Sequence, residues 1–370
     1  MRLIPADSAA LQQNNFDAIR LAMALMVVWS HSFALWLGSE RTEPISVLLA
    51  GSYNAGNLGV MAFFVISGFL VTRSFCNSKS PVSYMMKRVR RIYPGYLIAT
   101  SICAFVVIPA YAYVVDLSIG EIATTIGANL LLQNHLPPSN VFTTNSSNAV
   151  NGSLWSIPYE FWCYIGVCAL GVAGLLKRRL FIAVLTTAVL LGRVFQDLAD
   201  RPLHGGPVGY IVGDFYLWSM VLPYFLLGMV AFAFQDSIPR SRWLLCSLVA
   251  AAVIAAHAST HAAHLVVPVA LAYGVFYVAF SETVNLRDAA RWGDFSYGTY
   301  LYAFPIQQMV IASFGSTISF PLYIVLSMCL AVLAGVVSWH LVERWFLRTR
   351  SSPDHSATLK LAKASTVLRR

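Results

Sequence analysis

Residues 16–37, FDAIRLAMALMVVWSHSFALWL, form an apolar run that is long enough to cross a lipid bilayer. The run begins with Asp17 and Arg20, and a histidine, His31, follows eleven residues after Arg20. At about 1.5 Å of helical rise per residue, His31 lies roughly 16 Å from Arg20, near the middle of a bilayer of about 30 Å. Ionisable side chains at that depth are costly in hydrocarbon, so His31 is a candidate functional residue.

The composition of the whole chain is that of a polytopic membrane protein. Of its 370 residues, 58% are hydrophobic and 11% are charged, whereas soluble domains carry about 25% charged residues. The six cysteines show no CxxC or metal-ligand spacing and are interpreted as small buried hydrophobes. His257, His261 and His264 share nearly one helical face but have no acidic or Cys partner in the pattern, so no metal site is predicted.

The sequence predicts an all-α membrane bundle of about ten transmembrane helices. A further apolar segment, 121–133, is too short to cross and is expected to form an interfacial or re-entrant helix on the outer side. The polar residues 1–15 lead into a run too long for a cleavable signal. The predicted spans lie near 18–38, 58–75, 93–115, 154–176, 180–195, 215–235, 243–257, 265–281, 296–315 and 320–347.

The distribution of Lys and Arg predicts the orientation of these helices. Of the 25 Lys and Arg residues, 21 fall on the side shared by the two termini and three on the opposite side. The positive-inside rule therefore places both termini in the cytoplasm of a multi-pass protein of the inner (plasma) membrane. This distribution also argues against nucleic-acid binding as the reason for the net charge of +9. Residues 1–350 are expected to form one membrane domain and residues 351–370 a short, basic, disordered tail.

The first span carries three residues whose spacing permits a joint role. Asp17 and Arg20 are three residues apart, so they share a helical face and can form an ion pair. Arg20 and His31 are three helical turns apart, so both can face the same channel. The alternative is structural: Arg20 anchors the helix at the inner leaflet, and His31 is a hydrogen-bonded packing residue. The spacing alone leaves both interpretations open.

A basic stretch, YMMKRVRRIYP (84–94), precedes the third span. On a helix Arg88 and Arg91 share a face, and Pro94 is expected to mark the start of the next span. Guanidinium groups suit bidentate binding of phosphate, and Lys87 adds a further cation on the cytoplasmic side. The alternative is anchoring by positive charge at the membrane surface, which explains most such clusters.

A third stretch, NGSLWSIPYE (151–160), connects an outer loop to the fourth span. Glu160 lies inside the outer half of this span, where a carboxylate is either neutralised by a partner or functional. Trp155 and Tyr159 are either interfacial aromatic residues or surfaces that stack on sugar rings.

Two further features are expected to serve packing. In the second span, Gly59, Ser67 and Gly68 allow a neighbouring helix or an acyl carrier to approach closely, and no nucleophile elbow surrounds Ser67. His340 and Glu343 in the last span are expected to form an internal pair near the inner surface.

Taken together, these stretches resemble the acyltransferase 3 family, integral-membrane enzymes that O-acylate sugars. The resemblance covers residues 15–347, and one departure is Ala18, where glycine is usual. The matching motifs are Asp17-Ala-Ile-Arg20 with His31, Gly59-Val with the stretch Phe63–Leu70, Arg88-x-x-Arg91 with Ile92-Tyr-Pro94, and Asn151–Glu160.

The resemblance implies transfer of an acyl group, most often acetyl, from cytoplasmic acyl-CoA to a hydroxyl of a cell-envelope or exported polysaccharide (exopolysaccharide or lipopolysaccharide) or a lipid-linked sugar. Residues Lys87, Arg88 and Arg91 would hold the phosphates of acetyl-CoA, and His31 would act as general base or as a transient acyl carrier. A proton-coupled transporter is the alternative. The remaining site residues would be Asp17 and Arg20 beside the donor, and Asn151, Ser153, Trp155, Tyr159 and Glu160 on the acceptor side.

Overall fold

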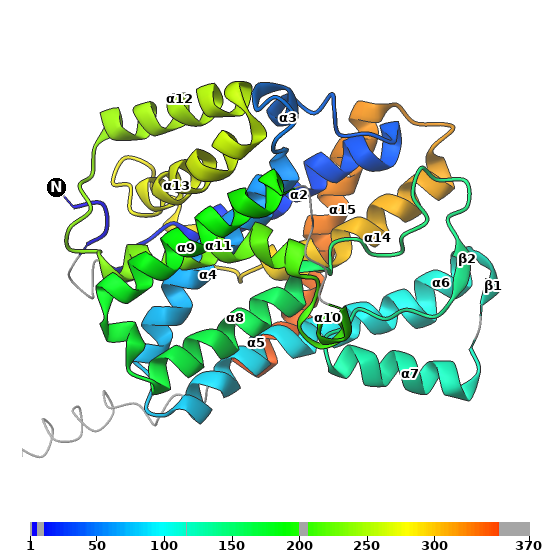
Figure 1. Cartoon of the computed structure of the whole chain (residues 1–370). Helices are drawn as coiled ribbons and strands as arrows, with labels where there is room; N and C mark the ends of the chain where they lie inside the picture. Colours follow the sequence, from blue (N-terminus) through cyan, green and yellow to red (C-terminus); the bar gives the residue numbers. More distant parts are fainter. Residues whose placement is uncertain (1, 6–10, 116, 200–205, 348–370) are drawn as a thin grey trace, which may run out of the picture.

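The computed structural model describes residues 2–5, 11–115, 117–199 and 206–347, so the predicted tail 351–370 lies outside the described residues. These residues form a helical bundle (Figure 1). Its longer elements are α2 (Phe16–Leu37), α4 (Ala55–Cys76), α5 (Pro81–Ile102), α7 (Ile119–Leu130), α8 (Ser156–Val172), α9 (Arg179–Leu198), α11 (Phe215–Ala233), α12 (Arg242–Ala258), α13 (Thr260–Ala279), α14 (Ser296–Phe314) and α15 (Phe320–Ser338). Shorter elements are α3 (Pro44–Leu48), η1 (Cys103–Val107), α6 (Ile108–Tyr111), β1 (Ala112–Val115), β2 (Ser139–Val141), η2 (Leu175–Lys177), α10 (Gly206–Val212), η3 (Arg287–Ala290), η4 (Trp339–Glu343) and α16 (Arg344–Leu347).

The predicted all-α membrane bundle is confirmed in its main feature. In the described part of the chain, seven helical segments are long and apolar enough to cross a membrane. The other three predicted spans are also helical, as α8, α12 and α14. The number of ten crossings and the cytoplasmic position of both termini stay predictions. The seven segments are 16–37, 55–76, 81–111, 179–198, 215–233, 260–279 and 320–347.

The start of the third span differs from the prediction. Helix α5 begins at Pro81 and continues through Pro94, so the arginine stretch is part of the helix and not a loop before it. Ser80 caps the helix by accepting a hydrogen bond from the Ser83 amide at 3.1 Å, and Pro81 occupies the first turn. Proline inside a membrane helix is tolerated because neighbouring groups satisfy the freed carbonyl. The expectation that Arg88 and Arg91 share a helical face therefore holds.

Helix α4 lies at the centre of the bundle, where it contacts α2, α8, α11 and α13. Its packing against α11 depends on two facing glycines. A Cβ atom on Gly68 would lie 2.0 Å from the carbonyl oxygen of Phe225, and one on Gly228 would lie 2.1 Å from that of Val65. Small residues permit such close backbone approach in membranes. The predicted packing role of Gly68 is confirmed.

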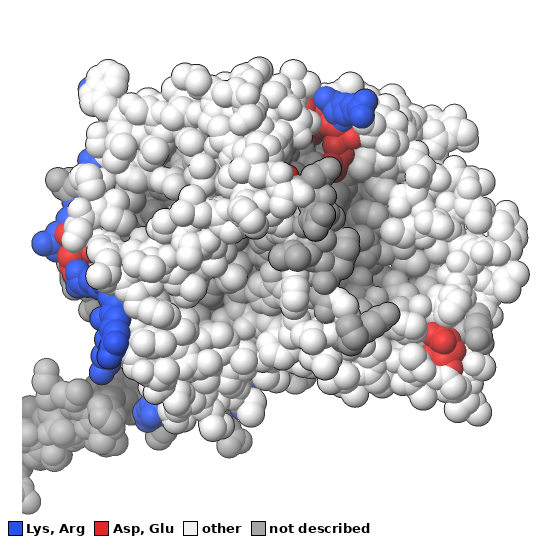
Figure 2. Space-filling view, in the orientation of Figure 1, with Lys and Arg blue, Asp and Glu red and all other residues white. Residues whose placement is uncertain are grey.

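Segments at one end of the bundle form a small apolar cluster of their own, which includes Ile108, Val141 and Phe142. There α6, α7 and the antiparallel pair β1–β2 lie together (Figure 1). Helix α7, which the sequence predicted, directs Thr125 and Asn129 toward the protein and leaves Ile119 and Ile126 exposed. A helix with polar side chains toward the protein and apolar side chains outward is suited to contact with lipid. At the opposite end of the face shown in Figure 2, Lys and Arg side chains gather along the edge.

The last span ends in the π-helical turn η4, followed by α16. This turn separates two residues that the sequence suggested as a pair. Glu343 accepts a hydrogen bond from the Ser338 hydroxyl at 2.9 Å, whereas His340 lies 3.1 Å from the guanidinium of Arg344. The expectation of a His340–Glu343 pair is therefore wrong, because the extra residue of the π-helical turn rotates the two side chains apart.

Candidate active site

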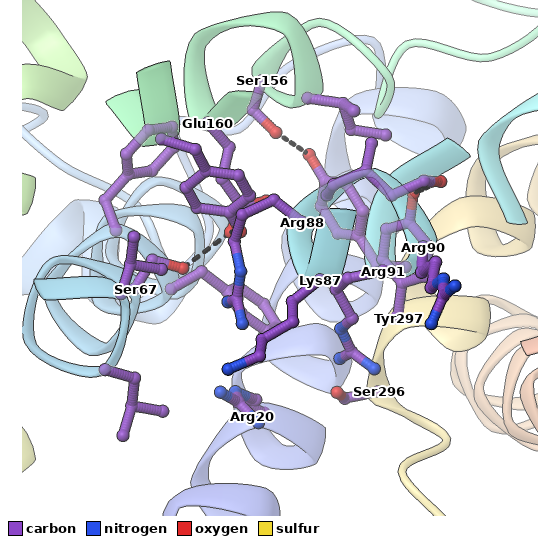
Figure 3. A pocket seen from close by; sticks show the side chains of 18 of the residues that line it. Arg20, Ser67, Lys87, Arg88, Arg90, Arg91, Ser156, Glu160, Ser296 and Tyr297 are labelled. Carbon is purple, nitrogen blue, oxygen red and sulfur yellow. Dashed lines mark hydrogen bonds between the residues drawn. The ribbon is translucent and has the colours of Figure 1, made fainter. Parts of the chain in front are cut away.

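A cavity of about 320 Å³ lies among α2, α4, α5, α8, α14 and α16 (Figure 3). In Figure 3 most of the cationic groups lie on one side of the cavity, and Glu160 and Ser156 lie on the other. Lys87 and Arg90 are exposed, so the cationic side reaches the protein surface. The polar residues that line the whole cavity are Arg20, Lys87, Arg88, Arg90, Arg91, Ser67, Ser156, Glu160, Tyr164, Ser296, Tyr297 and Tyr300.

Two of the arginines that line the cavity are held by one carboxylate, Asp294. Arg91 Nη2 donates to Asp294 Oδ2 at 2.6 Å, and Arg20 Nη1 lies 3.6 Å from the same oxygen. Arg20 also pairs with Asp17 at 3.1 Å, which confirms the predicted pair on the first helix. Asp294 therefore joins the base of α2 to α5.

The charge of Asp294 is well stabilised. Burial alone would raise the pKa of this carboxyl, but the guanidinium groups of Arg91 and Arg20 and a hydrogen bond from Ser296 hold the pKa well below its usual range. Asp294 is not among the residues that the sequence predicts, because an acidic residue two positions before a helical serine is also typical of an ordinary helix start. The feature of the sequence that could have identified Asp294 is its position directly before the predicted span 296–315.

Arg88 has a different environment from Arg91. Its guanidinium lies 5.9 Å from the ring of Tyr84 and 5.7 Å from the ring of Tyr164, and one amino group lies 3.4 Å from the Ser74 hydroxyl. Within the described residues its Nε atom is buried without a hydrogen-bond partner, and no carboxylate pairs with it. Arg88 is therefore the cation of the motif whose charge is available to a ligand, whereas the charge of Arg91 is taken up by Asp294.

Glu160 lines the far side of the cavity and accepts two short hydrogen bonds. The Ser67 hydroxyl donates to it at 2.6 Å and the Tyr164 hydroxyl at 2.5 Å. Ser67, which the sequence assigned to packing, thus also positions Glu160 between α4 and α8. Beside this group the hydroxyls of Ser156 and Tyr300 lie 2.7 Å apart. The cavity therefore ends in a set of hydroxyl groups around one carboxylate.

His31 lies beyond this end of the cavity. The residues that line the cavity include Arg20 but not His31, so the two do not share one open channel in this structure. The His31 ring instead meets the Phe304 ring edge-on, with centroids 5.2 Å apart. Phe304 follows Tyr300 by one turn of α14, or about 6 Å of rise. His31 thus contacts α14 one turn beyond Tyr300, which lines the cavity, and the His31 Nδ1 atom is buried without a partner among the described residues.

The loop predicted to contact the acceptor is held by internal contacts. The Asn151 side chain donates to the Leu301 carbonyl at 2.9 Å and lies 3.7 Å from the Cys103 sulfur, while the Tyr300 hydroxyl donates to the Ser153 carbonyl. A Cβ atom on Gly152 would lie 2.7 Å from the Phe304 ring, so this glycine allows the loop to cross directly over that ring.

The two aromatic residues of the same stretch differ in exposure. Tyr159 is buried, and its hydroxyl accepts from the Asp214 amide at 2.7 Å. Trp155 is partly buried and packs edge-on against Tyr159. Neither residue lines the cavity that contains Glu160. Tyr159 therefore joins α8 to the start of α11, where it also packs against Trp218, and Trp155 presents the larger accessible surface.

The described residues contain no group of three or more His, Cys, Asp or Glu side chains that could hold a metal ion. His264, from the histidine pattern noted above, instead pairs with Asp197 at 2.6 Å, and Asp197 pairs with Arg193 at 3.2 Å. This ion-paired group joins α9 to α13.

The fold and the cavity define a polytopic membrane protein with a cation-lined cavity inside its helical bundle. A family model for an acyltransferase domain, acyltransferase 3, matches residues 13–340. The chain belongs to this family, which confirms the resemblance drawn from its motifs, and the protein is an O-acyltransferase.

Three relatives are similar to this chain. The O-acetyl transferase of Shigella phage Sf6 is 30% identical over 357 residues, covering 93% of this chain and 99% of the relative. The exopolysaccharide production protein ExoZ of Rhizobium meliloti (strain 1021) is 26% identical over 320 residues, or 80% of this chain and 91% of the relative. Nodulation protein 10 of Rhizobium leguminosarum bv. viciae is 37% identical over 86 residues, 23% of each chain. No solved structure matches the chain.

Proposed function

We propose that this protein transfers an acetyl group from cytoplasmic acetyl-CoA to a hydroxyl of a cell-envelope or exported polysaccharide or of a lipid-linked sugar. The observation that carries the proposal is the cavity itself. Cations surround the side that reaches the surface, and the opposite side contains Glu160 and Tyr300. Tyr300 lies one turn of α14 before Phe304, whose ring contacts His31. The names of two relatives, an O-acetyl transferase and an exopolysaccharide production protein, support this acyl group and this class of acceptor.

The donor enters from the cationic side. Arg88, Lys87 and Arg90 bind its phosphates, because none of the three pairs with a carboxylate among the described residues. Arg91 and Arg20, held by Asp294, position the helices around the donor. The apolar residues between the cations and Glu160 accommodate the pantetheine arm, so that the thioester reaches the hydroxyl groups near Tyr300.

His31 acts as the general base at the far end. Its imidazole accepts the proton of the acceptor hydroxyl while the sugar oxygen attacks the thioester carbonyl. The carbon–sulfur bond then breaks, and the imidazolium returns the proton to the leaving CoA thiolate. Glu160, with its hydrogen bonds to Ser67 and Tyr164, orients the groups around the thioester. The reaction thus needs no group beyond the two substrates and these side chains.

The acceptor approaches from the opposite side of the membrane. The loop with Asn151 and Ser153 holds Phe304 next to His31, and Trp155 and Tyr159 shape the acceptor side of α8. With the termini in the cytoplasm of the inner membrane, as the distribution of Lys and Arg indicates, only the acetyl group crosses the bilayer.

Replacement of His31 by alanine tests the proposal. We expect His31→Ala to abolish acetylation of the glycan, measured by mass, in cells that contain the variant in the membrane at the wild-type level. His257→Ala is the matched control, because His257 is exposed at the end of α12. Normal acetylation in the His31 variant would refute the role of this residue, and failure of the purified wild-type protein to use acetyl-CoA would refute the donor.

A further inference from the structure

A second cavity, of about 330 Å³, lies beside the cationic side of the first. It is lined by Trp292, Trp339, His340, Arg344 and Leu347. Leu347 also lines the first cavity, so α16 separates the two cavities and borders both. A ligand that occupies the first cavity and extends past α16 therefore reaches the second.

The connection between η3 and α14 forms the other boundary of the second cavity. A Cβ atom on Gly293, whose φ is +140°, would lie 2.2 Å from the Trp339 indole nitrogen. The backbone can therefore lie against the edge of this indole only because residue 293 is glycine. The next residue, Asp294, holds Arg91 and Arg20 in the first cavity. One short segment thus borders both cavities.

The lining of the second cavity combines flat aromatic surfaces with a cation. Trp292 is 67% exposed, and Trp339 is partly buried. Arg344 contacts His340 at 3.1 Å and has no ion pair with a carboxylate in the described part of the chain, where its Nε atom is buried without a hydrogen-bond partner. Aromatic side chains stack on nucleobases, and guanidinium groups bind phosphates.

We propose that the second cavity holds the 3′-phosphorylated adenosine end of the acyl-CoA donor. The adenine stacks on Trp292 and Trp339, and the 3′-phosphate binds Arg344. The diphosphate then lies beside α16 at the cations of the first cavity, and the pantetheine arm extends inward. This inference rests on the proposed function, since it assigns a subsite to the donor named there. Tryptophan is also common at membrane interfaces, but that preference does not account for a cavity that also contains an arginine and that shares the lining residue Leu347 with the first cavity.

The first test uses Arg344→Gln in the purified full-length protein. KM is measured for acetyl-CoA and for acetyl-3′-dephospho-CoA, which lacks only the phosphate assigned to Arg344. We expect the wild-type protein to have a KM about tenfold lower for acetyl-CoA than for the dephosphorylated donor. In the variant the two KM values become equal, with kcat unchanged. A variant that keeps the wild-type preference overturns the proposal.

The second test uses Trp292→Ala, an exposed position where truncation does not disturb the fold. We expect KM to rise about tenfold for both donors and to stay unchanged for acetyl-pantetheine, which has no adenine. The matched control is Trp243→Ala. Trp243 is 71% exposed with Arg242 at 5.3 Å from its ring, and Trp292 likewise has Arg291 at 5.1 Å. An equal effect of both substitutions overturns the proposal.

A change of lipid composition distinguishes a site for the nucleotide of the donor from a site for an anionic lipid headgroup. All KM values are measured in neutral detergent and again with added phosphatidylglycerol. Effects of Arg344→Gln that appear only with the anionic lipid overturn the proposal in favour of a lipid site. A wild-type protein that does not transfer acetyl from acetyl-CoA at all refutes the proposed function. A wild-type protein that uses acetyl-CoA, together with variants that behave like it, refutes only the assignment of the second cavity.

Discussion

Replacing Asp294 by asparagine removes the charge that two arginines of the donor cavity share. The carboxylate lies 2.6 Å from Arg91 and 3.6 Å from Arg20, and its side chain is 13% exposed, against 21% for each arginine. The substitution keeps the size of the side chain and its ability to hydrogen-bond Ser296. The expected effect is therefore the loss of charge compensation and not the loss of packing.

The magnitude follows from the burial of these groups. Removing one partner of a buried ion pair typically costs about 3–5 kcal/mol, because the remaining charge stays buried without compensation. Since asparagine retains a hydrogen bond, we expect the lower end, about 3 kcal/mol. If the transition state loses half of this stabilising free energy, about 1.5 kcal/mol, kcat falls about tenfold. The KM for acetyl-CoA is expected to stay constant or to fall, because the substitution makes the cavity more positive.

The assay compares Asp294→Asn with Asp236→Asn in purified protein, using kcat, KM for acetyl-CoA and thermal stability in detergent. Asp236 also contacts two arginines, each at 3.6 Å, but it is 42% exposed. Exposed pairs contribute about 0–1 kcal/mol, so the control is expected to behave like the wild type. The pKa of Asp294 lies below its ordinary value of about 3.8, so its stabilisation is present above that value and constant between pH 6 and 8. Wild-type stability and kcat in Asp294→Asn would refute the positioning role.

Three further predictions concern single side chains. Arg88→Ala is expected to raise the KM for acetyl-CoA about tenfold with kcat retained, since its charge is available to a ligand; an unchanged KM would leave it an anchoring role. Phe304→Ala is expected to expose the thioester to water beside His31. Hydrolysis of acetyl-CoA in the absence of acceptor, measured as release of the CoA thiol, is therefore expected to rise, and Phe304→Tyr is the control. Glu40, in the connection between α2 and α3, accepts hydrogen bonds from Ser30 and Asn54. Burial raises the pKa of its carboxyl above the ordinary value of about 4.5, so stability is lost as the pH rises from that value through the raised pKa; Glu40→Gln is expected to flatten the dependence of the melting temperature on pH.

Most of the fold could be predicted from the sequence, because membrane helices are recognisable as long apolar runs. Every predicted span contains a helix in the structure, although the end of the third predicted span, 93–115, forms the strand β1 (Ala112–Val115). The largest error concerned α5, where hydropathy pointed to residue 93 while the helix starts at Pro81. Hydropathy fails there because the first turns of α5 are basic, and the Ser80–Pro81 start signal was not used. The sequence predicted that Gly68 allows a neighbouring helix to approach closely, but it did not identify α11 as that helix. The pattern of residues in one helix does not show which other helix packs against it.

The candidate site was predicted in its members but not in its arrangement. The motif spacing correctly paired Asp17 with Arg20 and placed Arg88 and Arg91 on one face. Spacing along a helix does not show which charges are compensated from other helices. Asp294 lies 203 residues from Arg91 along the chain and forms the ion pair with its guanidinium, whereas binding of phosphate by Arg91 stays a prediction. The contact of His31 with Phe304 likewise depends on α14, which no motif identified.

The position of Phe304 has a consequence for transfer across a membrane. A channel open from the cationic side to His31 would admit water and ions along the same path as the donor. In the structure the Phe304 ring contacts the His31 ring edge-on, and Gly152 allows the loop that begins at Asn151 to pack directly against the Phe304 ring. The proposed function requires the thioester and His31 to meet beside this ring. The tight packing of α4 on α11 through Gly68 and Gly228 makes the centre of the bundle rigid. The proposed transfer therefore depends on local side-chain rearrangement at Phe304 and not on an open pore through the bundle.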